Sequence, residues 1–276
     1  MKKNLTAIIF LILIGILFRY NFNKHSLYNP LTINQPVVNK QPLAFGRVET
    51  DLSQHKKKLM VALTFGQSNS ANYGETRYSS TENVFNYFKG KVYLAKDPLL
   101  GADGINGSVW TRLGDKLIKN NLYQNIIFVP IGVGGSNIAQ WSPGGNLHKR
   151  LLHNIRHVKR SGLEFTHLLW HQGESDAYPL RTPKNNYKYH FKQIIKSIRE
   201  EGVEAPVYIS IASNSNKLNG NNEVATAQKE LVNNIDILLG PNTDKLGPTY
   251  RYDGVHFTTE GLERFSDSWF KILSSN

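Results

Sequence analysis

The sequence predicts an α/β fold in which helices cover both faces of a central parallel sheet. From Leu59 onward, short apolar runs alternate with segments whose apolar residues recur at helical spacing. Each apolar run is followed by a polar or glycine-rich stretch. Because ligands bind beyond the carboxyl ends of the strands in open parallel sheets, these stretches are the expected place for the chemistry.

The apolar runs and periodic segments alternate along the chain. The predicted strands are 59–65, 125–131, 167–170 and 206–212. The predicted helices are 110–120, 146–161, 183–201, 223–238 and 258–273. In the last helix an apolar residue recurs every three or four positions from Leu262 to Leu273, which predicts one buried stripe. No internal repeat or low-complexity block divides 59–276, so we expect one domain there.

Composition excludes several classes of site. The 276 residues include no cysteine, which removes disulfides, thiolate metal sites and cysteine nucleophiles. A 40% apolar and 11% aromatic content suits a buried core rather than a disordered chain. The net charge of +12 would suit a nucleic-acid partner, but nine Lys and Arg against two acids precede residue 59. The body is therefore only mildly basic, and we expect no nucleic-acid partner.

The amino terminus, 1–24, is predicted to be a signal peptide or signal anchor. Two lysines precede an uncharged run at 5–18, and Arg19 follows it. The run has 14 residues, shorter than the roughly 20 of a comfortable transmembrane helix, and no A-x-A cleavage site follows. Either version predicts export to the periplasm or the exterior, with a membrane tether through 5–18 if the run is retained. Residues 25–58 are predicted to be a polar tether, and 59–276 the folded domain.

Two turns follow the first two predicted strands. Residues 66–70 (GQSNS) place Ser68 at a strand end, where a serine nucleophile would need a general base and donors for an oxyanion. Turns of this composition also occur without function. Residues 132–137 (GVGGSN) allow backbone N–H groups to approach a phosphate or an oxyanion, or simply form a tight packing turn. Neither a dinucleotide-binding pattern nor a P-loop is present there.

The third predicted strand runs into an unusually polar stretch, 170–176 (WHQGESD). The Gln172 amide can donate to a developing negative charge, and Glu174 and Asp176 can fix neighbouring side chains. A helix N-cap at Ser175 or Asp176 is the alternative interpretation.

A fourth segment, 253–256 (DGVH), precedes the last predicted helix. Asp253 lies three residues before His256, and the intervening glycine permits a turn between them. The carboxylate can then bind Nδ1–H of the imidazole and leave Nε2 to take a proton, as a general base requires. A single D-x-x-H is more often structural than catalytic, so this segment alone does not identify a base.

Together and in this order, GQSNS, GGSNIAQW, WHQGESDA and DGVH resemble the signature blocks of the SGNH (GDSL-type) hydrolase superfamily. The wording resembles its sialate O-acetylesterase and acetyl-xylan-esterase-like branch, and the resemblance spans about Leu59 to the end. It implies a three-layer α/β/α sandwich of flavodoxin-like type, and serine esterase activity without a metal or other cofactor.

The resemblance also implies roles for individual residues. Ser68 would be the nucleophile, His256 the base and Asp253 its orienting carboxylate. The backbone N–H groups of Ser68 and Gly135 and the Gln172 side chain would form the oxyanion hole. Glutamine stands at 172 where the superfamily name implies asparagine. Glu174 is a supporting carboxylate.

The expected substrate is an O-acetylated sugar, either sialic acid or another surface or plant glycan. Candidate substrate-binding residues next to the motifs are Gln67, Asn69, Arg77 and Trp141, with Tyr73, Tyr178 and Arg181 as further aromatic and cationic candidates. His153 and His157 share a helix face, but no carboxylate completes a metal site nearby. The alternative functions are a non-catalytic polysaccharide-binding module of the same fold and a glycan O-acetyltransferase.

Overall fold

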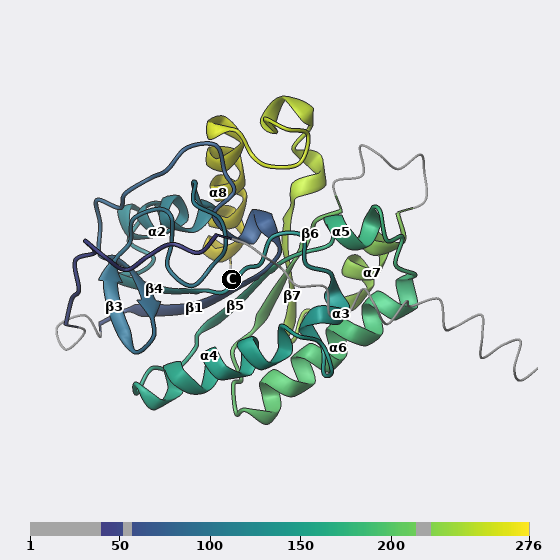
Figure 1. Ribbon diagram of the computed structural model, residues 1–276, viewed down its shortest axis with the longest axis horizontal. Coiled ribbons are helices and arrows are strands. Elements are labelled where there is room, and N and C mark those ends of the chain that lie inside the picture. The colour runs from purple at the N-terminus through teal and green to yellow at the C-terminus, as the bar shows by residue number, and fades with distance from the viewer. Residues whose placement is uncertain (1–39, 52–56, 214–221, 276) are drawn as a thin grey trace, which may run out of the picture. The chain divides into compact units, whose positions relative to one another are not determined.

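The computed structural model describes residues 40–51, 57–213 and 222–275 (Figure 1). The predicted signal or anchor segment, 1–24, lies outside these residues. Within the described ranges, no helix combines the length and the apolar character needed to cross a membrane.

One seven-stranded sheet organises the body, in the order β3-β2-β4-β1-β5-β6-β7. The strands are β1 (Leu59–Gly66), β2 (Val84–Phe88), β3 (Lys91–Leu94), β4 (Asn125–Pro130), β5 (His167–His171), β6 (Val207–Ile211) and β7 (Ile237–Asn242). β1 lies near the centre and pairs in parallel with β4 and β5. β3 pairs antiparallel with β2, and the other pairings are parallel. The predicted fold class is confirmed, with one antiparallel edge.

Helices cover both faces of the sheet (Figure 1). They are α2 (Val109–Lys119), α3 (Ile138–Trp141), α4 (His148–Arg160), α5 (Glu174–Ala177), α6 (Lys184–Glu200), α7 (Glu223–Leu231) and α8 (Thr259–Ser274). Side chains alternate across β1: Met60 and Ala62 pack with α2 and α8, whereas Leu63 and Phe65 pack with α4, α6 and α7. The core therefore has two layers, one on each side of the sheet.

A hairpin that sequence periodicity did not predict forms the β3 edge of the sheet. β2 and β3 are joined by Lys89 and Gly90, whose φ angles of 50° and 83° are both positive. Two consecutive positive φ angles are characteristic of the tight type I′ turn, which favours the twist of an antiparallel pair.

The same edge is covered by residues 40–51, part of the predicted tether. Glu49 bridges to Tyr93, Leu94 N–H donates to Val48 O at 3.0 Å, and Thr50 N–H donates to Val92 O at 2.9 Å. Because exposed strand edges invite unwanted pairing, this segment protects β3.

The predicted helix 223–238 is corrected by the structure. α7 ends at Leu231, and residues from Ile237 form β7. The Asn233 side chain accepts the N–H groups of Ile235, Asp236 and Ile237, and Asn234 has a φ of 58°. These local bonds compete with helix continuation, so the apolar residues beyond them enter the sheet.

Candidate active site

The turns that follow β1, β4 and β5 meet because the three strands are parallel neighbours. They line a pocket with a cavity volume of about 430 Å³. Its walls include Ser68, Gly135, Glu174 and His256, which come from four distant parts of the chain. The structure thus brings the predicted nucleophile, the predicted base and one predicted oxyanion donor onto one pocket.

The turn that carries Ser68 requires glycine at its start. Gly66 has a φ of +127°, and a Cβ there would lie 2.0 Å from the carbonyl oxygen of His171. This close approach lets Gln67 N–H donate to the same carbonyl at 3.0 Å. The short helix η3 (Ser68–Ser70) follows at once, which places Ser68 beyond the end of β1.

His256 is oriented by Asp253 as the sequence predicted. Asp253 Oδ2 lies 2.6 Å from His256 Nδ1, and Oδ1 accepts the backbone N–H groups of Val255 and His256. Burial acts to raise the pKa of Asp253, but these hydrogen bonds outweigh it and the pKa falls below its ordinary value. An ionised carboxylate at Nδ1 favours the tautomer in which Nε2 is free to accept a proton.

Two tyrosine rings flank the imidazole. Tyr73 stacks on His256 with ring centroids 5.2 Å apart, and Tyr252 lies on it at 6.0 Å. The Tyr252 hydroxyl donates to the backbone carbonyl of Tyr73 at 3.0 Å, which ties the two rings together. Tyr73 also reaches the glycine loop, since a Cβ on Gly134 would lie 2.4 Å from its hydroxyl. Tyr73 therefore contacts both the predicted base and the loop of Gly135.

The predicted backbone donors of the oxyanion hole are available. In the described part of the chain, neither the Ser68 N–H nor the Gly135 N–H donates to another protein atom. Both residues line the pocket. Gly135 has a φ of +69°, a conformation that favours glycine. A developing negative charge in the pocket can therefore be met by two N–H groups at no cost in internal hydrogen bonds.

Gln172 differs from its predicted position. Its side chain is fully buried, and its Nε2 lies 3.2 Å from Gln67 Oε1, 3.2 Å from Ser136 O and 2.5 Å from Asp176 Oδ2. Gln172 is not among the residues that line the pocket. Its N–H groups are directed to protein acceptors, and direct donation from Gln172 to an oxyanion stays a prediction.

Gln67 joins two of the turns. Its side-chain Oε1 accepts hydrogen bonds from the backbone N–H groups of Gly173 and Ser175 at 3.2 and 3.1 Å, besides the bond from Gln172. Gly173 begins α5 and has no side chain to cap it. Gln67 therefore supplies the missing acceptor at the start of α5 and links it to the turn of Ser68.

The supporting carboxylate, Glu174, is held by Asn69. Asn69 Nδ2 donates to Glu174 Oε1 at 2.8 Å, and Glu174 Oε1 also lies 3.8 Å from His171 Nδ1. Burial raises the pKa of Glu174 and lowers that of His171 to about 3, so the His171 imidazole is neutral near pH 7. The Glu174–His171 contact is consequently not an ion pair.

Two of the predicted substrate-binding residues do not line the pocket, and for Trp141 its burial corrects the prediction. Trp141 is fully buried, packs with Phe65 and Trp170, and donates its indole N–H to Ser136, so its ring is closed to a sugar. Arg77 donates to the Ile105 carbonyl at 2.8 Å and lies outside the pocket lining.

Asn69 and Gln67 are also engaged internally. Asn69 is buried, donates to Glu174 and Val255, and is not among the lining residues. Gln67 does line the pocket, but its Oε1 is occupied as described above. Tyr73 and Tyr178 are the tyrosines among the lining residues of the pocket. Ser213, also in the lining, lies two residues beyond the end of β6, so the rule that ligands bind at strand ends would have found it.

The sequence of residues 58–273 matches the family described as carbohydrate esterase, sialic acid-specific acetylesterase. The chain belongs to this family. The match covers the whole sheet and all four motif segments, in agreement with the superfamily resemblance of the sequence. Among the described residues, no group of three or more His, Asp or Glu side chains is arranged to hold a metal ion.

Relatives of this family member include a probable carbohydrate esterase of Arabidopsis thaliana, 27% identical over 166 residues. That alignment covers 58% of the chain and 60% of the plant protein, so it spans less than two thirds of the curated relative. A solved structure of an Arabidopsis thaliana protein shares the fold, with a TM-score of 0.66 at 19% identity over 80% of this chain and 99% of the other. NanS shares it with a TM-score of 0.55 at 14% identity over 79% and 97%.

Proposed function

We propose that the protein is a serine carbohydrate esterase that removes O-acetyl groups from sugars, with acetylated sialic acid as the first substrate to test. The observation that carries this proposal is the shared pocket of Ser68, Gly135 and His256, with Asp253 bound to the imidazole at 2.6 Å. Membership of the carbohydrate esterase family supports the same reaction class.

The reaction would proceed by two acyl transfers at Ser68. Its Oγ attacks the acetyl carbonyl while His256 Nε2 takes the hydroxyl proton, and the oxyanion is met by the N–H groups of Ser68 and Gly135. The C–O bond to the sugar then breaks, and His256 returns the proton to the departing sugar oxygen. A water molecule, deprotonated by His256, attacks the acetyl-serine and releases acetate, which restores Ser68.

The substrate would be held by the open part of the pocket. Tyr178 is 42% exposed and lines the pocket with Tyr73, so the two rings offer apolar faces to a pyranose. The cavity of about 430 Å³ suits a monosaccharide with its acetyl group rather than a long acyl chain.

The decisive experiment measures acetate release by the full chain from a panel of acetylated glycans, with Ser68→Ala as the matched control. We expect release by the wild-type chain alone, and fluorophosphonate labelling that Ser68→Ala abolishes. Glycan binding without acetate release or labelling would instead indicate a non-catalytic binding module. Transfer of the acetyl group to an added acceptor sugar, in place of acetate, would indicate an acetyltransferase.

We also propose that the apolar run at 5–18 exports the protein and tethers it to the membrane if it is retained. The proposal is supported by the two lysines before the run and Arg19 after it. Cell fractionation of the wild-type chain and of a variant lacking 2–24 tests it. Equal cytoplasmic recovery of the two would exclude this role.

A further inference from the structure

Helix α4 carries more net positive charge than any other helix that the structure describes. Residues 59–276 contain 24 Lys and Arg against 19 Asp and Glu. Helix α4 (His148–Arg160) contains five Lys and Arg and no acid. Helix α6 (Lys184–Glu200) also has five Lys and Arg, but it ends in Glu200, so α4 is the helix without an acid of its own to offset its cations. A run of cations without acids on one helix produces a positive field at that surface.

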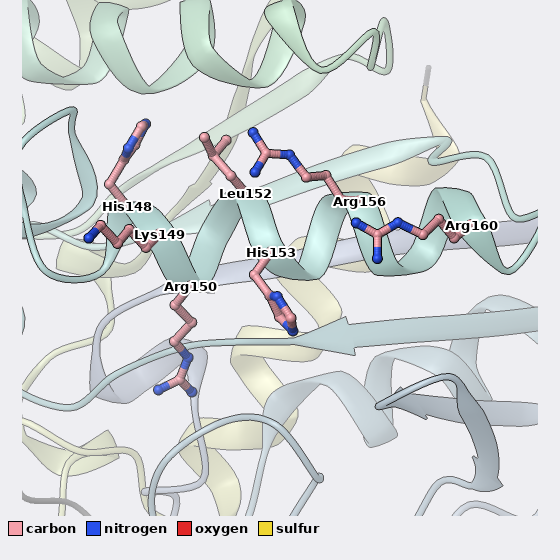
Figure 2. A pocket seen from close by; sticks show the side chains of 7 residues that line it. All are labelled: His148, Lys149, Arg150, Leu152, His153, Arg156 and Arg160. Atoms are coloured by element: carbon pink, nitrogen blue, oxygen red, sulfur yellow. The ribbon is translucent and has the colours of Figure 1, made fainter.

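Three exposed cations of α4, together with one exposed histidine, form a stripe. Lys149, His153, Arg156 and Arg160 follow one another at steps of four, three and four residues, which places them on one helix face. All four are exposed and line a surface groove with a cavity volume of about 690 Å³. Figure 2 shows the groove's side chains projecting from α4 alone, with Arg156 and Arg160 at its carboxyl-terminal end.

The ends of the stripe lack acidic partners. Arg156 pairs with Glu201, with an N–O distance of 2.5 Å, so its charge is partly neutralised. Lys149 and Arg160 form no ion pair with any residue in the described ranges. Lys149 also lies in the first turn of a helix with no side-chain cap, where the helix dipole disfavours a cation. A cation in this first turn lowers the stability of the helix, and such local costs are common at functional sites.

Helix α4 begins at the same end of the sheet as the candidate active site. β4 ends where the carboxyl ends of the parallel strands bear the pocket, and β5 begins at the opposite, amino-terminal ends of the strands. The helix α4, which lies between β4 and β5 in the chain, therefore runs from the carboxyl ends of the strands to their amino ends. Arg150 anchors its first turn to the Gly101 carbonyl, and the neighbouring Asp103 N–H donates to Gly132 O in the glycine loop. Thirteen helical residues extend about 20 Å, several sugar units long.

We propose that the α4 stripe binds an acidic polysaccharide, a linear polymer with carboxylate groups, along the path that leads from the pocket. The proposal rests on the proposed function for its choice of a carbohydrate ligand. Charge complementarity carries it: the stripe offers spaced cations to spaced carboxylates. A membrane surface fits less well, because three apolar residues of α4, Leu151, Ile155 and Val158, are buried in the core. Only the partly buried Leu152 reaches the groove, and a single leucine is too small an apolar face to insert into a membrane.

The test compares two variants of the full chain with the same change in net charge. Lys149→Glu/Arg160→Glu reverses the two unpaired cations of the stripe. Lys229→Glu/Lys271→Glu reverses two exposed lysines on α7 and α8 and serves as the control. Calorimetry measures binding to polygalacturonate, which carries no acetyl group, so the result is independent of catalysis. Hydrolysis of 4-nitrophenyl acetate measures the pocket separately.

We expect the stripe variant to lose about tenfold or more in affinity for polygalacturonate, since each cation near a polyanion contributes appreciably. Its turnover of 4-nitrophenyl acetate should equal that of the wild type, and the control should bind normally. Equal binding by all three chains would overturn the proposal. Stripe-dependent binding to phosphatidylglycerol vesicles without binding to polygalacturonate would also overturn it. Binding without any esterase activity would instead contradict only the proposed function.

Discussion

Replacement of Asp253 by asparagine tests which carboxylate orients the base. The substituted amide would keep an oxygen for the N–H groups of Val255 and His256, so the turn should remain intact. Its N–H₂ group would then face His256 Nδ1. Because Nδ1 must accept this hydrogen bond, the imidazole would carry its proton on Nε2. That tautomer cannot take a proton from Ser68.

The magnitude follows from the exposure of the pair. Loss of the orienting carboxylate in a buried serine triad costs about 10⁴ in kcat. Here the Asp253 side chain is 40% exposed, so water moderates the effect, and we expect a loss of about 10³, or roughly 4 kcal/mol of transition-state stabilisation. The assay is kcat/KM for 4-nitrophenyl acetate, with urea unfolding to show that stability is unchanged.

Glu174→Gln is the matched comparison. Glutamine keeps the oxygen that accepts from Asn69 Nδ2, and burial already raises the pKa of Glu174 toward its neutral form. We therefore expect less than about tenfold loss. If Asp253→Asn instead stayed within tenfold of the wild type while Glu174→Gln lost about 10³, Glu174 would be the orienting carboxylate and our reasoning would be wrong.

Three further predictions concern the scaffold of the site. Gln172→Ala should lower kcat. It should also lower the free energy of unfolding by about 2–4 kcal/mol, because the buried acceptors Ser136 O and Asp176 Oδ2 lose their donor. Unchanged stability in urea unfolding would favour direct donation from Gln172 to the substrate. Gly66→Ala should destabilise the fold by about 3 kcal/mol or more, since the new Cβ would lie 2.0 Å from a backbone oxygen. Gly144→Ala, where a Cβ meets open space, should cost about 1 kcal/mol because of the positive φ alone. Equal costs of the two variants in thermal unfolding would contradict this prediction. Burial lowers the pKa of His167 to about 4 from 6.5, so the unfolded chain binds the extra proton, and stability present above pH 6.5 is lost as the pH falls toward 4. By pH 4.5 the loss should be about 2–3 kcal/mol, and it should shrink in His167→Asn when unfolding is followed across this range.

The sequence predicted the centre of the sheet better than its edges, for a physical reason. β1, β4, β5 and β6 are buried on both faces and appear as continuous apolar runs. β7 follows α7 after a short break, in which the hydrogen bonds of Asn233 and the positive φ of Asn234 end the helix. The Lys89-Gly90 turn between β2 and β3 carries a weaker signal than an Asn-Gly turn would.

The candidate site was predictable where position along the chain decides the chemistry. Ser68 and Gly135 follow predicted strands and His256 precedes the last predicted helix, so their approach to one pocket could be expected. The direction in which a side chain points could not be predicted from its position along the chain. Trp141 lies next to a motif but turns into the core, and the Gln172 amide turns toward Asp176, because each finds a buried partner that sequence spacing does not reveal.

The three hydrogen bonds accepted by the side-chain oxygen of Gln67, Oε1, bear on how this scaffold can be altered. They fasten the segment after the first strand to the segment after the fifth, so neither can be exchanged alone without stranding polar groups in the interior. Engineers who wish to transplant a different acyl specificity onto this framework should move both segments as one cassette, and diversify the tyrosine at position 178 instead.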